Sequence, residues 1–133
     1  MKSRILTVLL LVAVAAFGMG SVGAQSSSPG ATLYALTSGG SILTIDAANP
    51  SQAMNSADIT GLGSGETLIG IDVRPATGEL FAVSDASRMY KIDPATGAAT
   101  AVGSGFTPVL DGTNIGFDFN PTVDRIRFNT DNT

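Results

Sequence analysis

Short apolar stretches follow one another along most of the chain, and each ends at a cluster of Gly, Pro, Asn, Asp or Ser. Stretches of this length that are rich in aliphatic, aromatic and Thr residues are typical of β-strands. The predicted strands are TLYAL, SILTID, TLIGIDV, ELFAVS, RMYKID, AATAVG and NIGFDF. No segment after Gln25 has a sustained helical period, and AANPSQAMNSADITGLGSG reads as a loop.

The predicted strands repeat along the sequence. LYALTSGGSILTID aligns without a gap on LFAVSDASRMYKID, which places Leu33 over Leu80 at an offset of 47 residues. LIGIDVRP aligns on NIGFDFNP, which places Asp72 over Asp118 at an offset of 46 residues. Two such offsets predict a unit of about four strands, the size of a propeller blade. We therefore expect an all-β, β-propeller-like repeat of four-stranded antiparallel blades, with a period of about 46–47 residues.

The tetrapeptide PATG occurs twice, once ending at Gly78 and once ending at Gly97. Pro fixes φ at the start of a turn, and Gly accepts the left-handed conformation that closes a hairpin connection. Asp93, before the second copy, can accept a hydrogen bond from its own turn. In the third unit Asp124 stands where Gly78 stands, and Asp tolerates the same conformation. We interpret both copies as turns within one blade, not as an active loop.

The first residues read as an export signal. A basic start with Lys2 and Arg4 precedes an apolar run, and Val22 and Ala24 are small residues of the kind that a signal peptidase recognises. The apolar run is shorter than the roughly 20 residues of a spanning helix. We expect residues 1–24 to be a signal peptide and 25–133 to be a partial propeller-like domain. The expected location is extracellular or periplasmic, with no membrane contact after cleavage.

Composition restricts the chemistry. The chain has 7 basic and 11 acidic residues, no Cys and no His. An acidic surface repels nucleic acid. Thiol nucleophiles, Ser-His-Asp triads and the usual zinc sites need residue types that this sequence does not contain.

Two long stretches of the sequence resemble a known family. The stretches GETLIGIDVRPATGELFAV and RMYKIDPATGAATAVGSGFTPVLDGTNIGFDFNPTVDRIRF are similar to domain-of-unknown-function family 4394, a group of secreted bacterial proteins with propeller-like repeats. The resemblance implies a fold and brings no established activity or catalytic residues. Because propellers usually have four to eight blades, we expect an incomplete chain with a fan of two to three blades.

Asp72 and Asp118 are the candidate metal ligands. They occupy equivalent places in the first strand of their units, so they could line a central channel and bind Ca2+. The alternative, which we prefer, is that each carboxylate accepts hydrogen bonds from nearby backbone, as residues repeated once per unit usually do. We predict no catalytic or cofactor-binding residue. Tyr34, Tyr90 and Phe81 are expected in the core or between blades, with a sugar-stacking platform as the alternative.

Three functions stay open from the sequence. The first is an exported binding or scaffold module without catalytic activity of its own, which recognises an extracellular protein or a glycan. The second is a calcium-dependent, lactonase-like propeller hydrolase with channel carboxylates. The third is a passive structural protein of the cell surface.

Overall fold

The protein is all-β in the computed structural model, which describes residues 11–14, 30–112 and 114–131. These residues form ten strands and no helix. The strands are β1 (Leu11–Val14), β2 (Thr32–Leu36), β3 (Ser41–Asp46), β4 (Ala53–Asp58), β5 (Leu68–Val73), β6 (Leu80–Ser84), β7 (Met89–Ile92), β8 (Ala99–Val102), β9 (Ile115–Asn120) and β10 (Arg125–Thr130). Within the described ranges no helix could therefore span a membrane.

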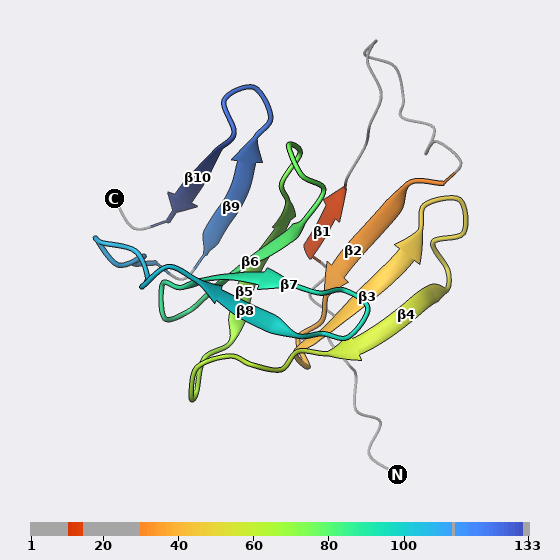
Figure 1. Ribbon diagram of the computed structural model, residues 1–133, viewed down its shortest axis with the longest axis horizontal. Coiled ribbons are helices and arrows are strands. Elements are labelled where there is room, and N and C mark those ends of the chain that lie inside the picture. Colours follow the sequence, from red (N-terminus) through yellow and green to blue (C-terminus); the bar gives the residue numbers. More distant parts are fainter. Residues whose placement is uncertain (1–10, 15–29, 113, 132–133) are drawn as a thin grey trace.

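The strands build three antiparallel sheets, none of them closed (Figure 1). The first sheet has the order β1-β2-β3-β4, the second β5-β6-β7-β8, and the third consists of β9 and β10. The predicted four-strand unit is confirmed in the second sheet, where consecutive strands pair as neighbours. The first strand of each sheet lies next to the first strand of the following sheet, in the order β1, β5, β9. We call these three the inner strands.

Two strands lie where the sequence predicts something else. β4 falls inside the stretch predicted as a loop; it forms the outer edge of its sheet and its residues are mostly exposed. An edge strand of this kind needs no apolar alternation, so the sequence gives little sign of it. β1 falls inside the predicted signal peptide. The rest of residues 1–24, and the expected cleavage position after Ala24, lie outside the described residues.

The turns follow the sequence prediction closely. Gly78 and Gly97 have φ values of +72° and +77°, and Asp124, the equivalent residue of the third sheet, has +47°. The predicted side-chain contact of Asp93 is also present: its Oδ1 accepts a hydrogen bond from the backbone N–H of Ala95 at 2.9 Å. Both PATG copies are thus hairpin connections, β5 to β6 and β7 to β8.

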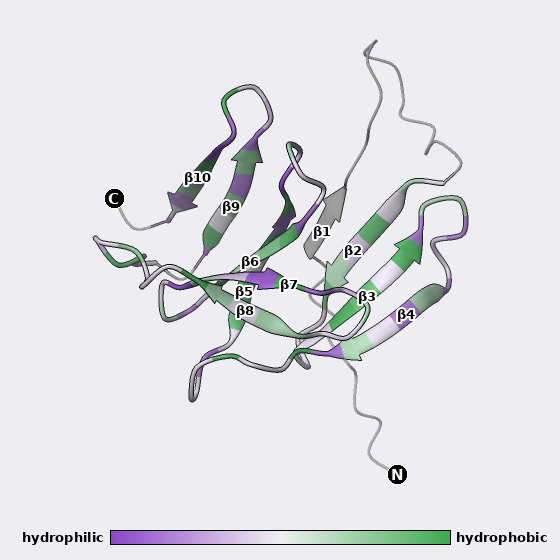
Figure 2. Ribbon diagram, viewed as in Figure 1, coloured by the Kyte–Doolittle hydropathy of each residue, from purple (hydrophilic) through white to green (hydrophobic). Residues whose placement is uncertain are grey.

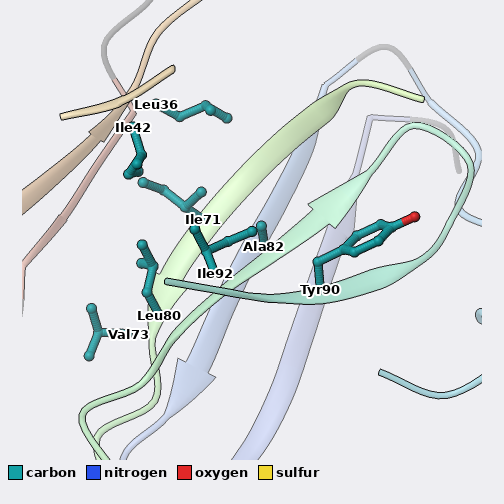
Figure 3. Close-up of a cluster of buried hydrophobic side chains, with 8 residues drawn as sticks. All are labelled: Leu36, Ile42, Ile71, Val73, Leu80, Ala82, Tyr90 and Ile92. Atoms are coloured by element: carbon teal, nitrogen blue, oxygen red, sulfur yellow. The ribbon is translucent and has the colours of Figure 1, made fainter. Parts of the chain in front are cut away.

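Two apolar clusters hold successive sheets together. The first joins the first and second sheets, and Figure 3 shows Leu36 and Ile42 of the first sheet beside Ile71 of the second. The second cluster joins the second and third sheets. Its buried members are Phe81, Val83, Phe117 and Phe119.

Strand β6 contributes to both clusters, and every one of its residues is buried. Leu80 and Ala82 belong to the first cluster, whereas Phe81 and Val83 belong to the second. Both faces of this strand are therefore covered by neighbouring sheets. In β9 and β10, by contrast, hydrophobic and hydrophilic residues alternate (Figure 2), because only one face packs against a neighbouring sheet.

Candidate functional site

The candidate ligands Asp72 and Asp118 lie on adjacent inner strands, β5 and β9, as their repeat positions predict. Asp72 is half-buried, and both of its oxygens accept backbone hydrogen bonds. Its Oδ1 accepts from the N–H of Val73 at 2.8 Å, and its Oδ2 accepts from the N–H of Phe119 at 2.7 Å. Asp72 therefore joins two sheets through a side-chain-to-backbone bridge, whereas Asp118 is exposed.

Burial is the main influence on the Asp72 carboxyl and raises its pKa above the usual 3.8. The hydrogen bonds from Phe119 and Val73 act in the opposite direction, and the charge of Asp118 adds a smaller upward contribution. The net result is a raised pKa for a carboxylate whose two oxygens are already engaged. Ca2+ takes six to eight oxygen ligands, and in the described part of the chain no group of three or more acidic side chains is arranged to hold a metal ion.

A second polar cluster surrounds Glu66, whose side chain is only 8% exposed. Its Oε2 accepts hydrogen bonds from the hydroxyl groups of Tyr90 at 2.7 Å and Ser84 at 2.9 Å. The Nε of Arg88 lies 3.4 Å from Oε1. Sequence reasoning did not identify this cluster, because its members come from the connection before β5 and from the β6–β7 hairpin, with no short motif linking them.

The Glu66 cluster also anchors the connection between the first and second sheets. The hydroxyl of Tyr90 accepts a hydrogen bond from the N–H of Gly63 at 3.1 Å. At the start of the same connection, the backbone N–H of Thr60 donates a hydrogen bond to the carbonyl of Gly97 at 3.0 Å, and the backbone carbonyl of Thr60 accepts one from the N–H of Ala99 at 2.8 Å. The stretch GLGSGE is thus part of the connection between the first and second sheets, and hydrogen bonds hold this connection at both ends.

A cleft of about 450 Å3 opens beside Glu66. Its walls come from the first sheet, the inter-sheet connection and the start of β5, and they are formed by residues 36–40, Ile59, Leu62 and residues 66–68. The lining combines aliphatic side chains with hydroxyl groups and one acid, and among the described residues it includes no basic and no aromatic side chain. Such a lining suits an uncharged polar ligand better than an anion.

The aromatic residues singled out from the sequence lie in the packing between sheets. Tyr90 is 1% exposed and Phe81 is 7% exposed. Tyr34 packs against the first apolar cluster. Phe81 also contacts Phe119 of the third sheet, with ring centroids 5.4 Å apart. The prediction that these rings are core and interface residues is therefore confirmed.

Fold and site together define an all-β protein of repeated antiparallel sheets, in which acidic side chains bind backbone and hydroxyl groups of neighbouring elements. The chain belongs to the family described as Domain of unknown function (DUF4394), whose model matches residues 41–133. This confirms the resemblance seen in the sequence. Comparison with the curated proteins and with the solved structures finds no match.

Proposed function

We propose that this chain is an exported, β-propeller-like module that acts as a binding or scaffold protein and has no catalytic activity of its own. The observation that supports this proposal is that two acidic side chains, Asp72 and Glu66, form hydrogen bonds that hold the fold together. Asp72 bridges β5 and β9, and Glu66 holds Tyr90 and Ser84. Side chains that are committed to folding in this way are poor general acids, bases or metal ligands.

The blade-like arrangement supports the same proposal. Successive sheets repeat the same strand order, their inner strands adjoin, and an apolar cluster fills each interface. In repeat proteins of this kind each unit mainly contacts its neighbours, and the assembled units present a binding surface. We infer that the sheets are blades and that the cleft beside Glu66 is the binding surface, for an uncharged segment of an extracellular glycan or protein.

A titration of the full chain, followed by amide NMR, tests the proposal. The probes are neutral oligosaccharides and uncharged extended peptides, and we expect saturable shifts at residues 36–40 and 66–68. Gly39→Leu should abolish these shifts, because a Cβ at Gly39 has no heavy atom closer than 3.8 Å and the longer side chain would fill the cleft.

Gly116→Leu is the matched control, since its Cβ also meets only ordinary contacts, the nearest at 3.6 Å, and it lies on β9 outside the cleft lining. It should leave the shifts unchanged. Shifts that persist in Gly39→Leu, or no saturable shift with any probe, would overturn the assignment of the cleft.

The calcium-dependent hydrolase is tested separately by thermal unfolding with and without Ca2+. A ligand present at about 100 times its Kd stabilises the folded state by about 2.7 kcal/mol, which raises Tm by several degrees. We expect no shift, because both Asp72 oxygens are already engaged. A rise in Tm that Asp72→Ala or Asp118→Ala removes would favour the hydrolase.

A further inference from the structure

The inner edge of the first sheet is occupied by β1, a strand from the predicted signal peptide. β1 pairs antiparallel with β2, with Val14 opposite Leu33. In the second sheet β5 pairs antiparallel with β6, with Val73 opposite Leu80. The repeat places Leu33 over Leu80. β1 therefore lies on β2 in the direction and register in which β5 lies on β6.

β1 differs from the other two inner strands at one central position. β5 and β9 carry Asp72 and Asp118 there, and the register places Ala13 at the same position of β1. Asp72 accepts the N–H of Phe119 on the following inner strand at 2.7 Å. Val73 is the residue of β5 that corresponds to Phe119, and its N–H donates to Asp72 of its own strand at 2.8 Å.

The two hydrogen bonds of Asp72 show that β1 provides no acidic residue to β5, whereas β5 provides one to β9. The inner strand of one sheet, β5, provides a carboxylate to the backbone of the next inner strand, β9. The inner strand on the other side of β5 is β1, which has Ala13 at the position where β5 and β9 have Asp. The N–H of Val73 therefore bonds to Asp72 of its own strand. β1 thus fills the backbone position of an inner strand without the acidic side chain that characterises the other two.

We propose that β1 is a temporary inner strand. In the uncleaved chain Leu11–Val14 covers the edge of β2, and removal of residues 1–24 uncovers a strand-acceptor site that selects the inner-strand sequence of this repeat, with Asp at its centre. An uncovered edge presents unpaired N–H and C=O groups that bind an added strand. The inference rests on the export step of the proposed function, since leader removal is the event that opens the site.

Cleavage of the folded full chain tests the covering role. A protease site is placed directly after Ala24, the protein is cut after folding, and the released leader is removed by gel filtration. Amide hydrogen exchange of β2 should become at least about tenfold faster after the cut. Exchange of β7, which is paired on both sides, should not change and serves as the internal control. Equal β2 exchange before and after the cut would overturn the proposal.

Peptide addition tests the selectivity of the opened site. A synthetic peptide of residues 67–74, TLIGIDVR, should restore slow exchange in β2 of the cut protein, and the same peptide with Asn for Asp should be about tenfold weaker. Failure of the Asp peptide to protect β2, or equal strength of the two peptides, would overturn the selectivity for an inner strand.

A substitution in the uncut chain tests the same geometry without cleavage. Ala13→Asp should slow exchange of the Val73 amide about threefold or more, because the backbone register then gives β1 an Asp at the position from which Asp72 of β5 accepts the Phe119 N–H. Ala13→Asn is the matched control and should have a smaller effect. No change at Val73 in Ala13→Asp would contradict the proposed register. These tests do not depend on export in cells, so failure of secretion and failure of the acceptor site are distinguishable.

Discussion

The two PATG turns are identical in sequence and differ in what surrounds their glycines, so one substitution made at both positions isolates the effect of the surroundings. A Cβ added at Gly78 would meet no heavy atom within 4 Å. A Cβ added at Gly97 would lie 2.1 Å from the carbonyl oxygen of Asp58, at the end of β4. Both glycines have positive φ, so Gly→Ala imposes the same backbone strain at each.

The size of the difference follows from the bonds around Gly97. The backbone strain common to both variants costs about 1 kcal/mol. Relief of the clash at Gly97 moves the turn away from β4, which breaks the bond from Thr60 N–H to Gly97 O at 3.0 Å and the bond from Asn55 Nδ2 to Pro94 O at 3.0 Å. Each such bond contributes about 1 kcal/mol. We expect a loss of about 3 kcal/mol for Gly97→Ala and about 1 kcal/mol for Gly78→Ala.

Urea unfolding followed by far-UV circular dichroism measures both losses, and thermal unfolding gives a second reading. A difference of about 2 kcal/mol corresponds to roughly 8 °C in Tm for a chain of this size. The measured slope with urea should be the same for both variants, because the surface exposed on unfolding does not change. Equal losses for Gly78→Ala and Gly97→Ala would show that the turn does not rest on β4, and the reasoning would then be wrong.

Three further predictions test the polar contacts. Asp72→Ala should reduce the free energy of unfolding by about 2 kcal/mol, since two backbone N–H groups lose their acceptor. The control Asp118→Ala should change it by less than about 0.5 kcal/mol. Equal losses in urea unfolding would contradict the bridge that Asp72 forms between β5 and β9. Tyr90→Phe should cost about 2 kcal/mol through the lost bonds to Glu66 and Gly63, and a wild-type unfolding midpoint would contradict this. Lowering the pH from about 5 to about 2.5 should destabilise the protein through Asp93. The hydrogen bonds from Ala95 and Thr96 hold the pKa of the Asp93 carboxyl below 3.8 in the folded chain, so protonation favours the unfolded chain. Asp93→Asn should weaken this pH dependence of stability, and an unchanged dependence would refute the assignment.

Asp72 contributes to the same pH dependence with the opposite sign. Its folded-state pKa is raised, so the folded chain binds this proton more tightly than the unfolded chain does. Stability from this group therefore increases as the pH falls through its folded pKa, and decreases again as the pH rises. A carboxyl titration by NMR should place Asp72 above 3.8 and Asp93 below it.

Much of the fold could be predicted because the repeat is encoded locally. The β5–β6 and β7–β8 turns need Gly at positive φ, and apolar residues on both sides of β6 indicate that both faces are covered. β4 could not be predicted in this way, because this mostly exposed edge strand is held by backbone pairing with β3 and by contacts with residues far along the chain, such as the bond from Asn55 to the Pro94 carbonyl. Periodicity carries no information about such a strand.

The site was harder to predict than the fold. Asp72 and Asp118 are equivalent in the repeat, yet the structure engages only Asp72 in a bridge to the next inner strand. That difference depends on the position of each sheet in the row, which the sequence of a single unit does not contain. Glu66 meets Tyr90 only after the inter-sheet connection has folded over the second sheet. A contact between residues so far apart has no local signal.

The double burial of β6 has a consequence for how the molecule unfolds. Because β6 contributes side chains to both apolar clusters, separation of either neighbouring sheet exposes part of the same strand. The free energies of the two interfaces are therefore coupled, and loss of one weakens the other. The three sheets should behave as one cooperative unit in which partial unfolding begins at the outer strands β10 or β4, and global unfolding begins only when β6 itself is released.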